Sequence, residues 1–355
     1  MPVEIIVLPP GTPDARPQML LNGGGIWRDV TPSAGDAFSA KEFRKKVETV
    51  LTIAMQQVSL NQQVNAMAQG FSSSFAPLYQ ELMPIEVRVA IASMFANEAS
   101  PLLRIHLHPS AEWIPWELLH DGQGFLGLRM QVVRMPVVTQ AARIAGPTQR
   151  DVRSVYNLLG NGALDAAIIP GWENTFATFN HGGWEKRCPN GGGQFASLDE
   201  FTSAAGADII HITCHGGLRD DENQPYYWSL DPDAPLYFNY RITSDTLAML
   251  QFDRSLVFGN ACSTAKGGKG VLHGFGALFM MKGALNFIGT LAPITQKTSV
   301  DFATAFYGNL LDPGKKFTIA DALLETKKSF IANTADPSYL FYSLYGPPDI
   351  LYRVP

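Results

Sequence analysis

Short apolar runs in the second half of the chain restrict the possible folds more than any other feature. They are short and mainly apolar, which is typical of strands that are buried on both faces of a parallel sheet. Segments with helical periodicity lie between the runs and are long enough to cross from one parallel strand to the next. The runs are SVYNLLG, ADIIHITCH, SLVFGNAC and ALNFIGTLA. They predict an α/β fold with a mainly parallel sheet.

The first part of the chain has its own series of elements. A capping box, Ser39 followed by Glu42, predicts the start of an amphipathic helix. A second helical pattern and two strands, PLLRIHLHPS and LRMQVVRMPVV, follow before residue 140, with IPWELL between the strands. A polar segment broken by Gly146 and Pro147 then separates the two series. We therefore expect an accessory N-terminal half, residues 1–145, and a second half, residues 146–355.

Net charge and cysteine content indicate which binding partners and which cellular compartment to expect. The 27 basic residues against 32 acidic ones give a net charge of −5 without an arginine-rich run, so we expect no direct binding of nucleic acid. The three cysteines lack zinc-ligand spacing, which favours free thiols in a reducing compartment. No signal peptide is evident at the N-terminus, and the most apolar stretch contains Lys282. These features predict a cytoplasmic protein without a membrane partner.

Two of the predicted strands end in residues that can perform chemistry. ADIIHITCHGG ends with His215 and Gly216, and SLVFGNAC ends with Cys262. Because an open α/β sheet forms its crevice at the carboxyl ends of its strands, both side chains emerge at one edge if the two strands are neighbours. A free thiol with a pKa of ~8.5 needs a base to become the nucleophilic thiolate. We therefore predict a dyad of His215 as base and Cys262 as nucleophile.

The same dyad needs donors for the oxyanion that develops during acyl transfer. Gly216 has no side chain, so its amide can approach a substrate carbonyl closely. The amide of Cys262 is the second predicted donor. This mechanism requires no cofactor.

Other residues that could carry chemistry have simpler interpretations. His211 lies inside its strand and is expected to be buried and hydrogen-bonded, and Cys214 is expected to point to the opposite face from His215 as a packing residue. His106 and His108 share a strand face, but no cluster completes a metal site, so we expect no metal. The acidic run Asp220 to Glu222 lacks the alternation of a calcium loop and is interpreted as solvated.

A ketosynthase-type acyl transferase is the competing enzyme class, since its nucleophile turn is similar to NACSTA. That class needs two further histidines downstream of the cysteine. Only His273 follows Cys262, so this interpretation fails.

An ordered set of motifs resembles the CHAT family, the caspase-like cysteine peptidases associated with tetratricopeptide repeats. The resemblance covers roughly residues 75–355 and rests on IPWELLHDGQGFLGLRMQVVRMP, ADIIHITCHGG, LVFGNACSTAKGGKG, GFGALFMMKGALNFIGTLAPI and YSLYGPPDILY. It implies a three-layer α/β/α sandwich preceded by a pseudo-caspase-like half without a second dyad. It assigns His215 as general base, Cys262 as nucleophile and Gly216 as oxyanion-hole glycine. It also implies a protein substrate, an activating protein partner and a role in prokaryotic signalling or defence.

The chain departs from the family pattern near the expected substrate cleft. Ala292 stands where many members have Trp, and Gln296 stands where Asp is frequent. Asn260 occupies the position, two before the nucleophile, at which related peptidases that cut after Lys or Arg have an acid. We assign Asn260 and Gln296 to substrate binding and expect a P1 residue that is not basic, unless Asp231, Asp233 or Glu222 enters the pocket.

Two hypotheses of function remain open at this point. The first is a cysteine endopeptidase that cleaves a specific protein. The second is a catalytically silent scaffold or sensor that acts through protein–protein contacts. The presence of base, nucleophile and oxyanion glycine favours the first.

Overall fold

The computed structural model describes most of the chain and includes both predicted strand ends. The described residues are 2–9, 12, 15–31, 38–59, 64–137, 148–159, 185–187, 204, 206–218, 226–229, 241–242, 250–252, 254–265, 274–333 and 336–355. The predicted boundary between the halves, at residues 145 and 146, lies outside them, as do Glu222, Asp231 and Asp233. The division into two halves therefore stays a prediction, and "N-terminal half" and "C-terminal half" denote residues 1–145 and 146–355 below.

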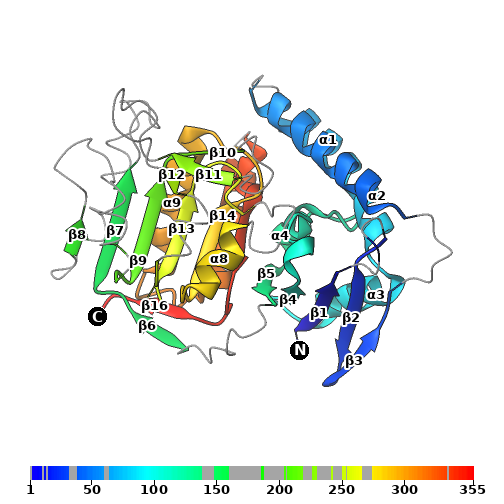
Figure 1. Cartoon of the computed structure of the whole chain (residues 1–355), viewed down its shortest axis with the longest axis horizontal. Coiled ribbons are helices and arrows are strands. Elements are labelled where there is room, and N and C mark those ends of the chain that lie inside the picture. The colour runs from blue at the N-terminus through cyan, green and yellow to red at the C-terminus, as the bar shows by residue number, and fades with distance from the viewer. Residues whose placement is uncertain are drawn as a thin grey trace.

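One sheet of 11 strands runs through both halves in the order β3-β2-β1-β4-β5-β15-β14-β13-β9-β7-β8 (Figure 1). Pairing is antiparallel at β1–β2, β2–β3 and β14–β15, and the other neighbours are parallel. The predicted mainly parallel sheet is confirmed. The strands are β1 (Val3–Leu8), β2 (Gln18–Gly23), β3 (Ile26–Asp29), β4 (Leu102–Leu107), β5 (Gln131–Pro136), β7 (Ser154–Leu159), β8 (Glu185–Arg187), β9 (Ile209–Thr213), β13 (Leu256–Asn260), β14 (Asn286–Thr290) and β15 (Tyr342–Tyr345).

The sheet reverses direction where the halves meet. Strand β15 is parallel to β5 but antiparallel to β14. Strands β1, β4, β5 and β15 therefore run opposite to β7, β9, β13 and β14. The parallel strands of the two halves consequently have their carboxyl ends at opposite edges of one sheet.

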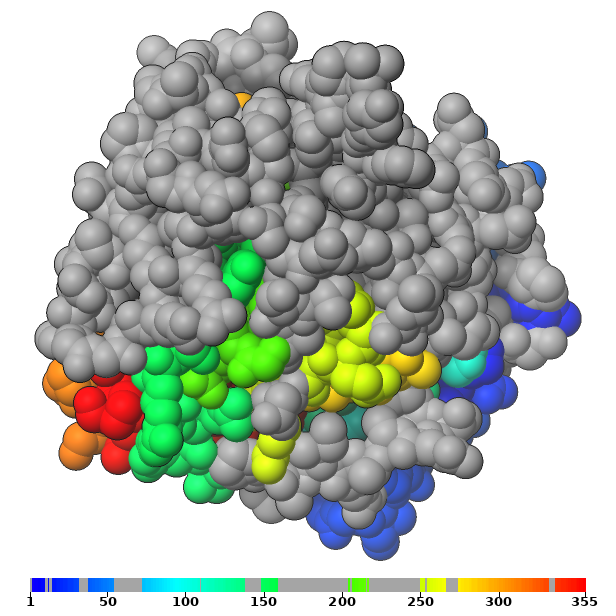
Figure 2. All heavy atoms as spheres, turned by 60° about the vertical axis from the view of Figure 1, so that its left-hand side comes forward, coloured from blue at the N-terminus to red at the C-terminus, as the bar shows by residue number. Residues whose placement is uncertain are grey.

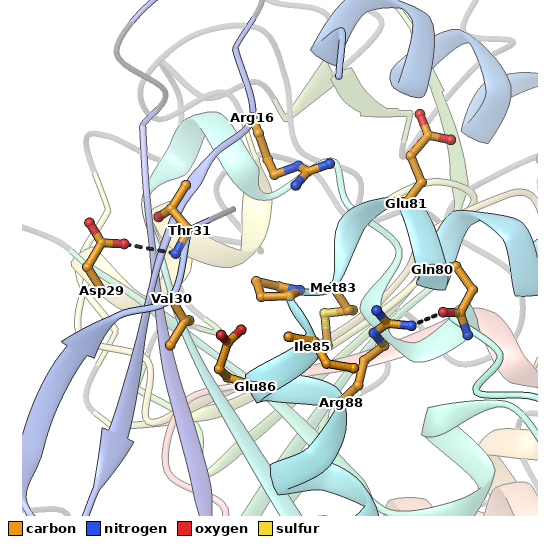
Figure 3. A pocket seen from close by; sticks show the side chains of 11 residues that line it. Arg16, Asp29, Val30, Thr31, Gln80, Glu81, Met83, Ile85, Glu86 and Arg88 are labelled. Atoms are coloured by element: carbon orange, nitrogen blue, oxygen red, sulfur yellow. Dashed lines mark hydrogen bonds between the residues drawn. The ribbon is translucent and has the colours of Figure 1, made fainter. Parts of the chain in front are cut away.

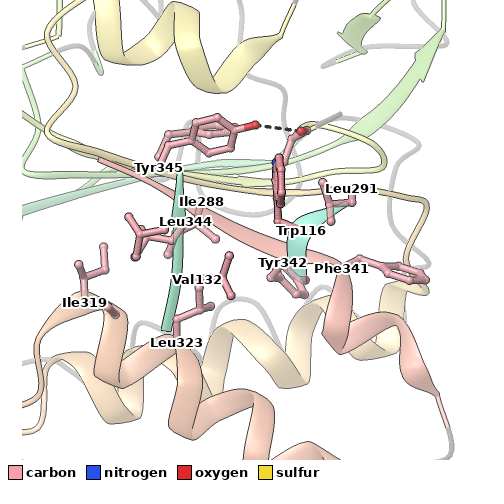
Figure 4. Close-up of a cluster of buried hydrophobic side chains, with 14 of the residues drawn as sticks. Trp116, Val132, Ile288, Leu291, Ile319, Leu323, Phe341, Tyr342, Leu344 and Tyr345 are labelled. Atoms are coloured by element: carbon pink, nitrogen blue, oxygen red, sulfur yellow. Dashed lines mark hydrogen bonds between the residues drawn. The ribbon is translucent and has the colours of Figure 1, made fainter. Parts of the chain in front are cut away.

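The helices cover both faces of the sheet. Helix α8 lies on one face of the central strands, and α9 and α10 lie on the other (Figures 1 and 4), which gives the predicted three layers. The helices are α1 (Ala40–Ser59), α2 (Val64–Leu82), α3 (Ile85–Asn97), α4 (Leu126–Arg129), α8 (Phe275–Met281), α9 (Gln296–Leu310) and α10 (Ile319–Asn333), with short 3-10 turns η1 (Pro109–Ala111), η2 (Trp116–Leu118) and η3 (Pro337–Phe341).

Two local predictions about these elements are confirmed. The Glu42 amide donates to the Ser39 hydroxyl at 3.2 Å, as a capping box requires at the start of α1. The IPWELL segment lies between β4 and β5 and contains η2.

Burial follows the sequence pattern of each strand. Strands β9, β13 and β14 are buried at every position, as uninterrupted apolar runs predict for a sheet that is covered on both faces. Strand β1 alternates between buried and half-buried positions, so one of its faces is less completely covered. On the face shown in Figure 2, residues from 148–159, 206–218 and 250–265 follow one another.

The remaining strands form two small sheets, and one of them changes the prediction for His215. Strands β10 (His215–Leu218), β11 (Tyr226–Ser229) and β12 (Arg241–Ile242) form a three-stranded sheet, and β6 (Gln149–Asp151) pairs with β16 (Leu351–Arg353). The run ADIIHITCH is therefore not one strand up to His215. Strand β9 ends at Thr213, and the chain passes at Cys214 into a different sheet.

Candidate active site

The predicted neighbourhood of the histidine and cysteine strands is confirmed. Strands β9 and β13 pair in parallel, and their last partners are Thr213 and Asn260. The residues that follow, Cys214 to Gly216 on one strand and Ala261 to Cys262 on the other, therefore leave the main sheet at the same edge.

The backbones of Gly216 and Cys262 are in direct contact. A Cβ placed on Gly216 would overlap the carbonyl oxygen of Cys262 and lie 3.1 Å from its amide nitrogen. No side chain can be accommodated at position 216 without separating the two segments, which explains the glycine there. The contact places the two segments that carry the predicted oxyanion donors side by side, and the role of their amides stays a prediction.

His215 begins β10, where it pairs with Ser229 of β11. The structure thus places its backbone one residue before Gly216, beside the cysteine segment. Its side chain lies outside the described part of the structure, so its role as base stays a prediction.

Hydrogen bonds hold the turn that carries the cysteine, residues 261–265, which we call the nucleophile loop. The Thr264 hydroxyl donates to the Gly259 carbonyl at 2.9 Å and accepts from the Thr290 amide at 2.8 Å. The Thr290 hydroxyl donates to the Ala261 carbonyl at 2.6 Å, and the Ala265 amide donates to the Thr290 carbonyl at 2.8 Å. The end of β14 therefore fixes both ends of the loop.

Ser263 turns the chain directly after the cysteine. Its φ of 58° lies in the left-handed region, which non-glycine residues rarely adopt. Such conformations persist where the surrounding contacts enforce them, and they are common at functional sites. The turn gives Cys262 a fixed position on a sharply bent segment.

The Cys262 thiol is half-buried, and its sulfur lies 4.0 Å from the Ile294 carbonyl oxygen. Burial raises the pKa of this thiol above its ordinary value, although the backbone groups of Ile294 and Cys262 lower it in part. Ionisation at neutral pH therefore needs a base, because desolvation favours the neutral form.

Gln296 is the first residue of α9, two positions after Ile294, and it is half-buried. The start of α9 is capped by Thr295, whose hydroxyl also donates to Asp336 at 2.7 Å. Asp336 accepts from Thr298 as well. The structure thus places Gln296 on a held segment close to the thiol, and its role in substrate binding stays a prediction.

The side-chain amide of Asn260 is enclosed by neighbouring residues of the fold. Its side chain is buried, with the amide donating to the Ser299 carbonyl at 3.0 Å and accepting from the Tyr342 hydroxyl at 2.7 Å. The amide nitrogen and the amide oxygen both have hydrogen-bond partners within the fold, because β13 is covered by packed residues on both of its faces. Asn260 therefore supports the strand end, and its role in substrate binding stays a prediction.

His211 is buried and hydrogen-bonded as predicted, and Cys214 is buried as expected of a packing residue. His211 is fully buried, with one ring nitrogen 2.9 Å from the Tyr307 hydroxyl and the other 3.1 Å from the Thr213 hydroxyl. Burial lowers the pKa of His211 to about 3, so the ring is neutral. Cys214 is buried. Neither residue competes with the predicted dyad.

A separate cavity of about 530 Å³ lies in the N-terminal half, between the end of β3 and the start of α3. Figure 3 shows that it contains side chains of both charges, including Arg16, Arg88, Asp29 and Glu86. It shares no lining residue with the nucleophile loop. Within the described residues there is no cluster suited to a metal ion and no helix long and apolar enough to cross a membrane.

Sequence reasoning missed a buried ion pair in the N-terminal half. Arg134 of β5 and Glu117 of η2 are almost completely buried and form a two-point pair, Nε to Oε1 at 2.9 Å and Nη2 to Oε2 at 2.6 Å. Arg134 also donates to the carbonyls of Glu112 and Ile114. The available signal was an arginine inside the apolar run QVVRMP, since a charge in a buried strand requires a partner.

Comparisons with known proteins agree with this architecture. The family model described as "CHAT domain" matches residues 74–345. No curated protein matches the chain. Separase from Saccharomyces cerevisiae, solved in complex with securin, is similar over 99% of this chain with a TM-score of 0.59 and 9% identity. The chain spans only 30% of that separase chain.

A second solved structure is gingipain R, an Arg-specific cysteine proteinase. It aligns with 79% of this chain and 70% of its own length at 11% identity and a TM-score of 0.48. At such low identities the likeness to separase shows the fold alone. The family match extends over more than half of the chain and includes the IPWELL segment, the histidine and cysteine strands and β15. The chain belongs to the CHAT domain family.

Proposed function

We propose that the protein is a cysteine endopeptidase with Cys262 as nucleophile and His215 as general base. The backbone contact between Gly216 and Cys262 carries the proposal, because it joins the nucleophile segment to the residue that follows the base. The family match supports the reaction class. The raised pKa of the Cys262 thiol explains why a base must act on it.

The reaction proceeds through an acyl-enzyme. His215 takes the thiol proton, and the Cys262 sulfur attacks the scissile carbonyl carbon. The amides of Gly216 and Cys262 donate hydrogen bonds to the oxyanion. When the tetrahedral intermediate collapses, the C–N bond breaks and His215 protonates the leaving amine. A water molecule, deprotonated by His215, then hydrolyses the thioester and regenerates the thiol.

The direct test is selective alkylation followed by proteolysis. Iodoacetamide should label Cys262 ahead of Cys188 and Cys214, and His215→Ala should slow labelling at Cys262. Uniform labelling of the three thiols would count against the dyad. Cys214→Ala is the matched control, because it removes a neighbouring thiol that lies outside the proposed mechanism.

Cleavage itself is tested with a lysate of the host cell as substrate and N-terminal peptide sequencing by mass spectrometry. New N-termini should appear with the native chain and be absent with Cys262→Ala. If the Cys262→Ala chain keeps its full cellular effect and cleavage never appears, the scaffold hypothesis replaces the peptidase.

The substrate and setting are part of the proposal. We expect a protein substrate, an activating protein partner and a role in prokaryotic signalling or defence in the cytoplasm, as the family resemblance implies. We keep the expectation of a P1 residue that is not basic, because Asn260 is neutral at the position where related peptidases that cut after Lys or Arg have an acid. A peptide-library profile dominated by Lys or Arg at P1 would overturn that expectation.

A further inference from the structure

Tyr345 links the two halves of the sheet to the nucleophile loop. It is the last residue of β15, which pairs with β5 of the N-terminal half on one side and with β14 on the other. Its hydroxyl donates to the carbonyl oxygen of Ala265 at 3.0 Å (Figure 4). Ala265 is the last residue of the nucleophile loop, three positions after Cys262.

The phenol ring of Tyr345 is held on several sides. Its residue is 1% exposed, and a Cβ on Gly276 of α8 would lie 2.5 Å from the ring. The Phe287 ring packs against it at a centroid distance of 5.7 Å. Burial raises the pKa of Tyr345 far above its ordinary value, so the hydroxyl stays protonated. The ring is therefore fixed in position, and its hydroxyl remains a donor throughout the working pH range.

Arg134 is the contact of Tyr345 in the N-terminal half. The two residues are register partners in the β5–β15 pair, and the Arg134 guanidinium carbon lies 5.7 Å from the centre of the Tyr345 ring, a distance at which a cation and an aromatic ring attract. Glu117 holds that guanidinium at two points. Contacts therefore continue from Glu117 through Arg134 and Tyr345 to Ala265.

We propose that Tyr345 is a positioning residue for the reaction, which fixes the Ala265 end of the nucleophile loop and is itself oriented by the Glu117–Arg134 pair. The proposal rests on the proposed function, because it takes Cys262 as the nucleophile. Loss of the hydroxyl removes the Tyr345 bond to the Ala265 carbonyl. The loop then relaxes, and the Cys262 sulfur moves relative to its base. A displacement of ~1 Å between two reacting groups is enough to slow a reaction strongly.

The test compares two buried tyrosines that differ in what they bind. Tyr352 is 2% exposed, and its hydroxyl donates to Asn286 Oδ1 at 3.0 Å rather than to the nucleophile loop. Tyr345→Phe and Tyr352→Phe each remove one buried donor, so both should lower Tm by a similar, small amount, about 1–3 °C. The rate of iodoacetamide labelling at Cys262, followed by mass spectrometry across pH, should fall about fivefold in Tyr345→Phe alone.

The outcomes separate this proposal from the proposed function. Equal labelling rates in the native chain and Tyr345→Phe, or equal losses in both tyrosine variants, overturn the positioning role. Labelling does not require proteolysis, so this arm remains readable even if Cys262→Ala shows that the protein is no peptidase. Where cleavage is measured, Tyr345→Phe should lower kcat and leave KM unchanged.

The role of the ion pair is tested by a double-mutant cycle. Glu117→Gln keeps the shape of the side chain and removes its charge, so it should slow labelling of Cys262 in the same direction as Tyr345→Phe. If the contacts act in series, the double variant should be slower than the native chain by less than the product of the single effects. Fully multiplicative effects would overturn the coupling of Glu117 to Tyr345.

Discussion

Two regions of the molecule bury polar groups, but of different kinds. The first, which we call the seam, consists of β5, β15 and the residues packed around Arg134, and the second is the nucleophile loop with the end of β14. At the seam, Arg134 and Glu117 are buried charges, and Lys327 of α10 lies close enough to Glu117 to affect its pKa. Around the nucleophile loop the buried polar groups are neutral and hydrogen-bonded, such as Thr264 and Thr290. Buried charges thus lie on the N-terminal side of the β5–β15 contact, and neutral groups hold the nucleophile loop.

This difference has an energetic meaning. A buried ion pair gives little net stability, but removal of one partner leaves an uncompensated charge that is costly. A neutral hydrogen bond costs less to remove. The seam should therefore be less tolerant of single substitutions than the region that carries the proposed chemistry.

The largest expected effect tests that contrast directly. Glu117→Leu leaves the buried Arg134 without its carboxylate and should lower the free energy of unfolding by about 3–5 kcal/mol, measured by urea denaturation. The matched control is Lys297→Gln, which breaks an exposed pair with Asp301 and should cost less than about 1 kcal/mol. If both variants lose the same amount, the seam is not the charged anchor described above.

A pH dependence of the seam comes next in size. Burial, opposed in part by Arg134, raises the pKa of Glu112 from 4.5 to about 7. The folded-state pKa of Glu112 is above its unfolded value. Its contribution to the free energy of unfolding is therefore fully present below pH 4.5 and is lost as the pH rises through 7. Between pH 5 and 8 the free energy of unfolding of the native chain should fall by about 2–3 kcal/mol more than that of the Glu112→Gln variant, as measured by urea denaturation. Parallel pH profiles of the two proteins would contradict this prediction.

The buried histidine of the C-terminal half should respond to pH in the opposite sense. Burial lowers the pKa of His211 from 6.5 to about 3. Its contribution is therefore present above pH 6.5 and is lost as the pH falls toward 3. From pH 7 to pH 5 the free energy of unfolding of the native chain should fall by about 2 kcal/mol more than that of the His211→Gln variant. Urea denaturation at the two pH values measures this, and an equal loss in both proteins would remove the contrast between the two regions.

The smallest effect concerns the loop itself. Thr264→Val removes the hydroxyl that bonds Gly259 and Thr290 and should cost about 1–2 kcal/mol, well below the loss in Glu117→Leu. Differential scanning calorimetry on both variants gives the ranking. A loss in Thr264→Val that exceeds the loss in Glu117→Leu would reverse the comparison.

The sequence was sufficient for features that depend on local pattern. Short apolar runs identified β9, β13 and β14, and the positions at which they end placed Gly216 and Cys262 at one edge of the sheet. Doubly buried strands have a distinctive composition, so these predictions needed no knowledge of distant contacts.

Long-range pairing was outside the reach of the same reasoning. The reversal at β15 depends on pairing with β5, about 200 positions earlier in the chain, and apolar pattern carries no direction. The separation of His215 into β10 depends on pairing with β11. The burial of Asn260 depends on Tyr342 and Ser299, which come from distant segments. Spacing locates a residue at a strand end, but only packing decides what its side chain contacts.

Because the sheet reverses direction, the carboxyl ends of its strands lie along two opposite borders, which we call rims, and a ligand can reach each rim separately. The loops that follow β9 and β13 lie on one rim, whereas the loops that follow β1, β4 and β5 begin on the other. A ligand that approaches Cys262 and one that docks on the residues after β4 would arrive from opposite sides of the sheet. They would not compete for space, so both could be bound at once.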